Sequence, residues 1–194
     1  MANETHLSLL ARVQETTFGS SWNEFSAMYD GLIQGWLHRQ GVQSQDADDI
    51  RQEVMTIVLR QIGKFEHNGR TGAFRAWLKA ITSNCLRDHW KKRKRNAGGG
   101  PDLGEMAAQL EDDASRQSLM WNAEHDRYVL NHLLDSIGER MSEKSVTAFR
   151  RLVIDEEDAA TVAAELEMTV GAARVAQHRV LKALKESGSG LLDY

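Results

Sequence analysis

The chain has 194 residues, with 24 lysines and arginines, 28 acidic residues and a single cysteine. This length suits one large domain or two small ones, and one cysteine excludes an internal disulfide framework. The first residues, MANETHLSLLARVQ, lack the basic and long apolar segments of a secretory signal. A membrane-spanning helix needs about 20 apolar residues, and no apolar run approaches this length. We therefore expect a cytoplasmic protein.

The net charge of −4 hides a local concentration of cations. Residues 72–95, GAFRAWLKAITSNCLRDHWKKRKR, hold eight cations and one acidic residue, which leaves about −11 for the remainder (−4 minus +7). A basic segment on an acidic background indicates a polyanionic partner for one surface. The alternative is a solvated helix end, whose cations complement the helix dipole.

Helical spacing dominates the chain from its first apolar pattern onward. Residues 21–39 predict a helix, because apolar side chains from Trp22 to Trp36 recur at three- and four-residue steps. A second helix runs to about residue 63, and we expect Asp46 to cap its start. No segment shows the strict apolar–polar alternation of a half-buried strand, so the sequence predicts an all-α fold.

A third helix follows a loop rich in glycine and asparagine, FEHNGRTG at residues 65–72, and extends to residue 95. Phe74, Trp77 and Cys85 share its apolar face. We therefore expect Phe74 and Trp77 in the core rather than stacked on a base. Cys85 is expected as a small core residue rather than a reactive thiol.

The composition changes after this helix. Residues 96–120 predict a linker, which starts with NAGGGPDLG and continues with many acidic residues. Residues 121–187 predict four helices, the first over 122–139. The last two follow the order short helix, tight turn, longer basic helix, which is typical of a helix-turn-helix, and Thr169 is expected to cap the last one. The alternative is an ordinary helical hairpin at the end of a bundle.

Three segments form a long ordered pattern: DADDIRQEVMTIVLRQIGKF, GAFRAWLKAITSNCLRDHWKKRKR and GAARVAQHRVLKALK. Together they resemble bacterial RNA polymerase sigma factors of the sigma-70 family. The resemblance is to the extracytoplasmic-function (ECF) class, in which sigma regions 2 and 4 are joined by a linker. It implies an all-α fold of two small helical domains, with an N-terminal extension at 1–20, region 2 at 21–95, a linker at 96–120, region 4 at 121–187 and a tail at 188–194.

The resemblance assigns roles to side chains of each unit. A polar stripe on the second helix would bind the β′ clamp of core polymerase, and its residues are Asp48, Asp49, Gln52, Glu53 and Thr56. The third helix and the loop before it would bind and melt the −10 promoter element, because cations follow phosphates and polar edges hold unstacked bases. Those residues are His67, Asn68, Asn84, Arg87, Asp88, Trp90, Lys91, Lys92, Arg93, Lys94 and Arg95. The final helix would read the −35 element in the major groove through Arg174, Gln177, His178, Arg179 and Lys182.

The resemblance further implies promoter DNA, the β flap of polymerase and an anti-sigma factor as partners. It implies no catalysis, no cofactor and no metal. Two positions depart from the family pattern: Glu167 stands in a turn where many relatives have glycine, and Ala173 stands where many have a β-branched residue. We therefore expect a different turn geometry and looser packing there.

Rival functions explain less of the sequence. A helix-turn-helix regulator that is not a polymerase subunit leaves the pattern over residues 46–95 unused. An adaptor that docks on polymerase without reading DNA leaves the basic runs unused, and the stripe on the second helix has the alternative of a solvated acidic face. An enzyme is disfavoured because the sequence has no HExxH, no paired cysteine ligands, no glycine-rich phosphate loop and no Gly-x-Ser-x-Gly.

Overall fold

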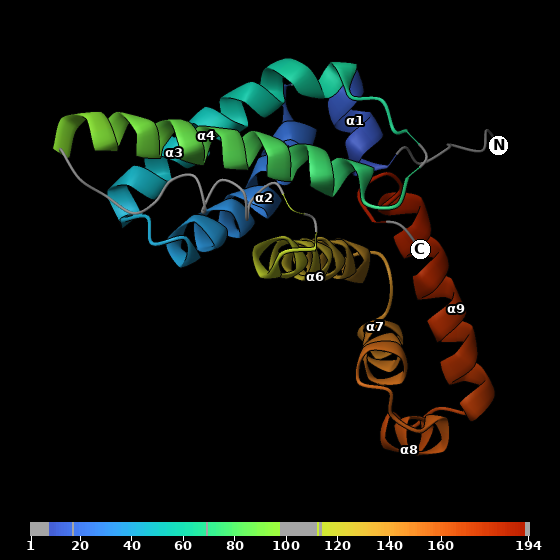
Figure 1. The fold of residues 1–194 in the computed structure, drawn as a ribbon. Coiled ribbons are helices and arrows are strands. Elements are labelled where there is room, and N and C mark those ends of the chain that lie inside the picture. Colours follow the sequence, from blue (N-terminus) through green and yellow to red (C-terminus); the bar gives the residue numbers. More distant parts are fainter. Residues whose placement is uncertain (1–7, 17, 69, 98–111, 113, 193–194) are drawn as a thin grey trace.

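The computed structural model describes residues 8–16, 18–68, 70–97, 112 and 114–192. Its elements are α1 (Leu9–Glu15), α2 (Ser20–Arg39), α3 (Ser44–Gln61), the 3-10 turn η1 (Ile62–Lys64), α4 (Ala73–Ala97), α6 (Arg116–Gly138), α7 (Glu143–Phe149), the π-helical segment η2 (Arg150–Ile154), α8 (Ala159–Glu165) and α9 (Val170–Ser187). No β-strand occurs among the described residues (Figure 1). The predicted all-α fold is confirmed.

Helices α2, α3 and α4 form the first unit (Figure 1). Phe25, Tyr29 and Trp36 lie on the buried face of α2, as their spacing predicts. The ring centroid of Phe74 on α4 lies 5.9 Å from that of Phe25 and 5.8 Å from that of Tyr29. Cys85 is buried on the same helix. The predictions that Phe74 and Cys85 are core residues are confirmed.

The start of α3 differs from the prediction. The helix begins at Ser44, and Gln43 occupies the cap position without a side-chain hydrogen bond. Asp46 therefore does not cap the helix; it lies in the first turn, where its negative charge complements the helix dipole. Its carboxylate also lies near His89 and Arg93 of α4.

The second unit consists of α7, α8 and α9, with the short α8 followed by a turn and the longer α9 (Figure 1). Thr169 Oγ1 accepts a hydrogen bond from the amide of Ala172 (3.1 Å), so the predicted cap is confirmed. Glu167 adopts a φ of 52°, the left-handed conformation that glycine favours, so the expected departure in turn geometry is wrong. Ala173 is fully buried in this unit.

Helix α6 begins six residues before the expected position 122, at Arg116 (122 minus 116). Ser115 Oγ accepts a hydrogen bond from the amide of Ser118 (3.1 Å) and caps this earlier start. Residues 116–120, expected in the linker, are therefore helical. The remainder of that expected linker falls mostly on residues 98–111 and 113, which lie outside the described chain.

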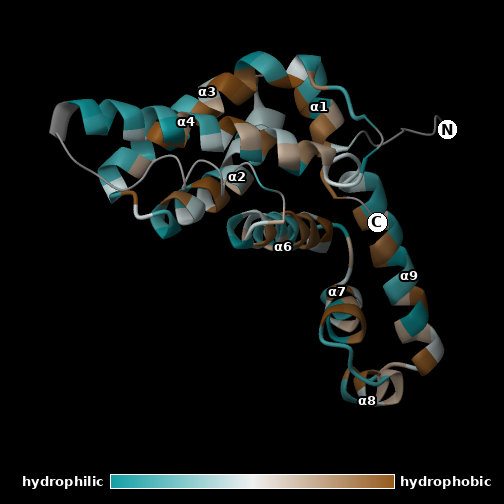
Figure 2. Cartoon of the chain, in the orientation of Figure 1, coloured by the Kyte–Doolittle hydropathy of each residue, from teal (hydrophilic) through white to brown (hydrophobic). Residues whose placement is uncertain are grey.

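Helix α6 also joins the two units. It packs on α2 and α4 of the first unit and on α7 and α9 of the second. Trp121 of α6 is fully buried, and its ring centroid lies 5.3 Å from that of Trp36 on α2. One buried core therefore runs through both units, and Figure 2 shows apolar sides of the helices turned toward it.

The segments next to the two ends of the chain meet on the first unit. Leu9, Leu10 and Val13 of α1 are buried, and so is Leu191 near the other end. Gly190 has a φ of +82°, and a Cβ there would lie 2.9 Å from Cδ2 of Leu10. Glycine is therefore required for this close approach. Neither segment had been assigned a structure from the sequence.

Candidate nucleic-acid interface

The basic end of α4 is exposed over residues 91–95, and the helix end is hydrophilic in Figure 2. Some of its cations have acidic neighbours. Lys91 Nζ lies 3.4 Å from Oδ1 of Asp88, and Arg93 Nη1 lies 3.6 Å from Oδ2 of Asp46. These contacts are largely exposed, so they contribute little stability and are readily exchanged for contacts with a polyanion.

Trp90 corrects one part of the predicted −10 surface. Its side chain is 9% exposed and belongs to the hydrophobic core. It lies four residues after the fully buried Leu86, on the same face of α4. Trp90 therefore offers no free ring face to a base. Asn84 and Asp88 are exposed and Arg87 is half-buried, with the Arg87 guanidinium donating to Oδ1 of Asn84.

An open groove lies between the loop at residues 65–72 and the start of α4. Phe65 and Trp77 contribute half-buried aromatic rings, with centroids 5.2 Å apart. Asn68 and Arg70 line the same groove, and Asn68 Oδ1 accepts a hydrogen bond from the amide of Arg70 (3.0 Å). His67 is exposed in the same loop. The groove combines aromatic faces, an amide and a cation, which are the groups that hold an unstacked base and its phosphate.

Two residues of this groove differ from the sequence interpretation. Trp77 was expected in the core, but it is half-buried and lines the groove. Phe65 was not singled out, although it stands at the loop's first position, where a half-buried aromatic residue precedes polar ones. Asn84, by contrast, lies about two helical turns beyond Trp77 on α4.

The polar stripe on α3 is present on the outer face of that helix. Asp49, Gln52, Glu53 and Thr56 are exposed, and Thr56 Oγ1 donates to the carbonyl oxygen of Gln52 (2.8 Å). Asp48 differs from them because it is half-buried and accepts a hydrogen bond from Gln34 of α2 (3.0 Å). The stripe available to a partner is therefore narrower than predicted.

The five residues predicted to read the −35 element lie along α9. Arg174, His178, Arg179 and Lys182 are exposed, and Gln177 is half-buried. His178 and Lys182 also line a hollow between α9 and α1, together with Ala11 and Leu181. Figure 1 places α9 and the basic end of α4 on opposite sides of the molecule, so the two sets of cations form separate surfaces.

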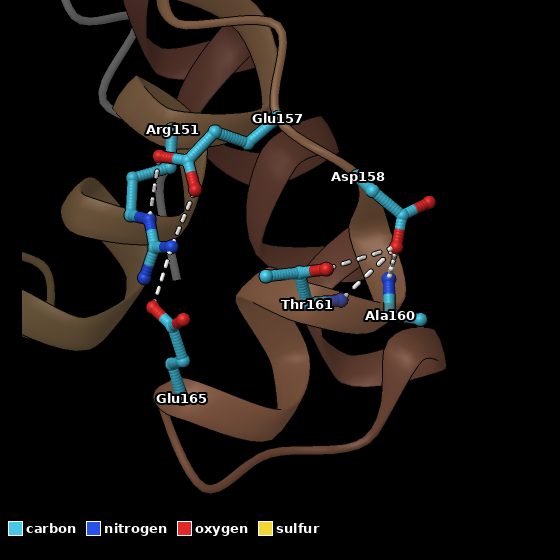
Figure 3. A network of polar contacts seen from close by, with 6 residues as sticks. All are labelled: Arg151, Glu157, Asp158, Ala160, Thr161 and Glu165. Atoms are coloured by element: carbon cyan, nitrogen blue, oxygen red, sulfur yellow. Dashed lines mark hydrogen bonds and ion pairs between the residues drawn. The ribbon is translucent and has the colours of Figure 1, made fainter.

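An ion-pair network fixes the turn that leads into α8 (Figure 3). Arg151 donates to Glu157 (2.8 Å) and to Glu165 (2.7 Å), and these hydrogen bonds raise its pKa. The same contact lowers the pKa of Glu157. Asp158 accepts from the amides of Thr161 (3.1 Å) and Ala160 (2.9 Å), which lowers the pKa of its carboxyl group. The network ties η2 to both ends of α8.

Other chemistry finds no support in the described part of the chain. No three histidine, cysteine or acidic side chains there are grouped to hold a metal ion. Burial raises the pKa of the Cys85 thiol to about 12, which makes it a poor nucleophile. No helix within the described ranges is long and apolar enough to cross a membrane.

Comparison with known families addresses the first unit directly. Residues 27–96, which hold most of α2 and all of α3 and of the groove loop, match the model of sigma-70 region 2. Over these residues the chain is similar to sigma-70 region 2. The match supports a sigma-70 family member and a sigma-factor role in promoter recognition by RNA polymerase, with core polymerase and promoter DNA as partners. Sigma factors are regulatory, non-catalytic proteins. No curated protein matches the chain.

Proposed function

We propose that the protein is an ECF-type sigma factor, which binds core RNA polymerase, delivers it to a promoter and helps to melt the start region. The observation that carries the proposal is the region 2 match over a unit that presents three separate surfaces. These are the polar stripe on α3, the aromatic groove before α4 and the basic end of α4. A single DNA-binding function would leave the stripe on α3 unused.

For the −10 element, the groove and the basic helix end divide the work. Phe65 and Trp77 supply ring faces for an unstacked base, and Asn68 supplies donors and acceptors for its edge. The cations at 91–95 supply sequence-independent affinity for phosphates. Asn84 is a second base-contacting candidate on the exposed side of α4.

For the −35 element, α8 and α9 act as a helix-turn-helix of region 4. The turn at Glu167 and the Thr169 cap set the start of α9, and Arg174 lies on its exposed N-terminal part. Recognition helices contact base edges through such positions, and arginine pairs well with guanine. Region 4 would also contact the β flap, and an anti-sigma factor would restrain the protein in the cytoplasm.

The proposal is tested with the purified full-length chain and core polymerase. Binding to core enzyme, followed by transcription from a promoter library with mapping of start sites, should give initiation that depends on the added chain. A second candidate function, a helix-turn-helix regulator outside polymerase, is favoured by α8 and α9 alone. It would give DNA binding without core binding and without new start sites.

A further inference from the structure

The segment that follows α9 folds back onto α1, the first helix of the chain. Helix α9 ends at Gly188, whose carbonyl oxygen accepts hydrogen bonds from the amides of Leu191 (2.9 Å) and Leu192 (2.9 Å). Both leucines are buried in the same hydrophobic cluster as Leu10 of α1. The backbone of Gly190 lies against Leu10 so closely that a Cβ would meet its Cδ2. We call residues 189–192 and their contact with Leu10 the latch.

The latch joins the two units at a second point, away from the centre of α6. Helix α1 belongs to the first unit, because it packs on α2 and η1. Its Arg12 donates to Glu24 of α2 (2.9 Å), and its Gln14 donates to the carbonyl oxygen of Ile62 (3.2 Å). Helix α9 belongs to the second unit and ends beside α1 (Figure 1). Release of the latch therefore leaves α6 as the main contact between the units.

The contact of α6 with the first unit has the character of an interface that opens. The Tyr29 hydroxyl lies 3.0 Å from Nε2 of the fully buried His125, and Lys79 Nζ donates to Oγ of Ser118 (3.0 Å). Nε1 of Trp36 is buried without a hydrogen-bond partner among the described residues. Interfaces between separable domains are more polar than permanent ones, and exposure of an unsatisfied donor to water recovers free energy.

The arrangement of the two units in the structure is too compact for two-site binding to a promoter. The −35 and −10 elements lie about 25 base pairs apart, which is about 85 Å of duplex. A compact chain of 194 residues has a radius of gyration of only about 16 Å. In addition, His178 and Lys182 of α9 line the hollow that faces Ala11 of α1. The chain must therefore open before both elements are bound.

We infer that the structure is a closed resting form, and that residues 189–192 are an intramolecular latch that holds the second unit on α1 until core polymerase separates the units. The role of polymerase rests on the proposed function, whereas the latch itself does not. The 18 residues between Ala97 and Arg116 (116 minus 97 minus 1) reach at most about 60 Å, so the units can move far apart without a break in the chain.

The first measurement is the rate at which a cysteine in the interface is labelled in the free full-length protein. Ser118 is 1% exposed and faces α4, so the thiol of Ser118→Cys reacts with an aromatic disulfide reagent only when α6 leaves the first unit. The native Cys85 adds little background, because it is buried and its pKa is raised to about 12. Labelling of Ser118→Cys should be at least tenfold slower than labelling of the same chain unfolded in urea. Equal rates would overturn the closed form.

Two substitutions in the latch, each with a matched control, are then added to Ser118→Cys. Gly190→Ala places a Cβ against Leu10 and should speed labelling by about tenfold, because overpacking at that contact favours the open form. Gly138→Ala makes the same change at the end of α6, where a Cβ meets nothing within 4 Å, and should keep the rate.

Leu191→Ser removes a buried side chain and should also speed labelling by about tenfold, whereas Leu119→Ser, at a 57% exposed position of α6, should not. Unchanged rates in both Gly190→Ala and Leu191→Ser, or an equal rise in the controls, overturn the latch.

The second measurement separates the latch from the proposed function. The apparent affinity of a protein for its partner is reduced by the fraction of molecules in the competent form. Without the added cysteine, Gly190→Ala should therefore bind core polymerase up to about tenfold more tightly than the parental chain, and Gly138→Ala should not. Faster labelling with unchanged core affinity supports the latch and overturns its release by polymerase. Absence of core binding by the parental chain overturns the proposed function, and the latch is then decided by the labelling rates.

Discussion

Asp46 Oδ2 lies 3.6 Å from Nη1 of Arg93, which joins the first turn of α3 to the basic end of α4. The same carboxylate oxygen lies 3.5 Å from Nε2 of His89. On the other side of the run, Lys91 lies 3.4 Å from Asp88. The cations that would meet DNA phosphates therefore have internal acidic neighbours, and a phosphate must compete with these carboxylates.

Asp46→Asn tests this competition. The substitution removes the carboxylate near Arg93, so the guanidinium becomes available to one more phosphate. We expect the log–log salt dependence of DNA binding by holoenzyme to steepen by up to about 0.9 on duplex DNA, the contribution of one contact. Glu139→Gln changes the net charge equally at an exposed position after α6. A slope that is the same in both variants would show that Arg93 does not reach DNA.

Substitution of the basic residues 91–95 and substitution of Asn84 should have different effects on DNA binding. Replacing all five residues at 91–95 by glutamine should flatten the salt slope by roughly 2–3 units and weaken all promoters alike, because helical geometry turns some of the five away from DNA. Asn84→Ala should leave the slope nearly unchanged and relax discrimination at one −10 position.

A salt series on a set of −10 variants measures both effects at once. A parental slope in the five-glutamine variant would show that the run is a solvated helix end. Equal weakening of every −10 variant by Asn84→Ala would move base reading into the loop, at His67 and Asn68. Both residues are exposed in the loop, so they are accessible to a base without any rearrangement of the fold.

Charge reversal on the α3 stripe tests polymerase docking. Glu53 is exposed, so Glu53→Lys should leave the fold intact. It should weaken binding to core polymerase by about tenfold, because it places a like charge or an unpaired charge against the partner. Glu139→Lys, on an exposed position of another element, is the matched control. Competition against a labelled parental chain gives both affinities, and equal affinities would move the docking surface away from Glu53.

Periodicity predicted the faces of single helices well, since burial follows the 3.6-residue repeat. The same rule places Trp90 on the buried face with Leu78 and Leu86, twelve and four residues before it. Trp90 was instead predicted to contact DNA, because it directly precedes the basic residues 91–95. Periodicity carries no information on which distant helix covers a face. The pairing of Trp121 with Trp36 therefore had no local signal in the sequence.

The start of α6 was missed for a different reason. Residues 102–126 are rich in acidic side chains, and composition favoured a loose segment. The structure shows Ser115 as a cap, followed by a helix whose Ser118 and Trp121 are buried. The spacing of residues does predict this helix start, because a capping residue is followed by two buried positions three residues apart. The partners of that face, Arg75 and Lys79, lie on α4 and could not be read from it.

The turn before α9 stores strain that one substitution should release. Glu167 has a φ of 52°, which costs a residue with a Cβ about 1–2 kcal/mol. Its exposed contact with Lys144 (3.8 Å) contributes little. We expect Glu167→Gly to stabilise the protein by about 0.5–1 kcal/mol after the larger backbone entropy of glycine is included. Urea unfolding followed by circular dichroism measures the change.

Ala164→Gly, three residues before Glu167, supplies the opposite case. Ala164 is exposed in α8, where the backbone is helical, so glycine there should destabilise by about 1 kcal/mol. The two glycine substitutions thus differ in sign within four residues of each other. Destabilisation by both would mean that the left-handed turn at Glu167 is not kept in solution.

The cap of α8 should make the second unit sensitive to acid. Hydrogen bonds from the amides of Thr161 and Ala160 lower the pKa of Asp158 from its ordinary value of 3.8. A carboxyl group whose folded pKa is lowered stabilises the fold above its unfolded pKa, near 4, and this stabilisation is lost as the pH falls through the folded value. At pH values below about 4, the melting temperature should therefore decrease, in part because this capping carboxylate becomes protonated.

Two substitutions at Asp158 separate titration from capping. Asparagine caps helices about as well as aspartate and does not titrate, so the melting temperature of the parental chain relative to Asp158→Asn should drop as the pH falls below about 4. Alanine removes the cap at every pH, so Asp158→Ala should melt below Asp158→Asn throughout. Melting curves from pH 7 down to about pH 2.5 follow the loss of this stabilisation as the pH falls below the unfolded pKa near 4. A constant difference between the parental chain and Asp158→Asn across that range would show that the charge of Asp158 is not coupled to folding, and that the Ala160 and Thr161 amides are satisfied equally by the neutral acid.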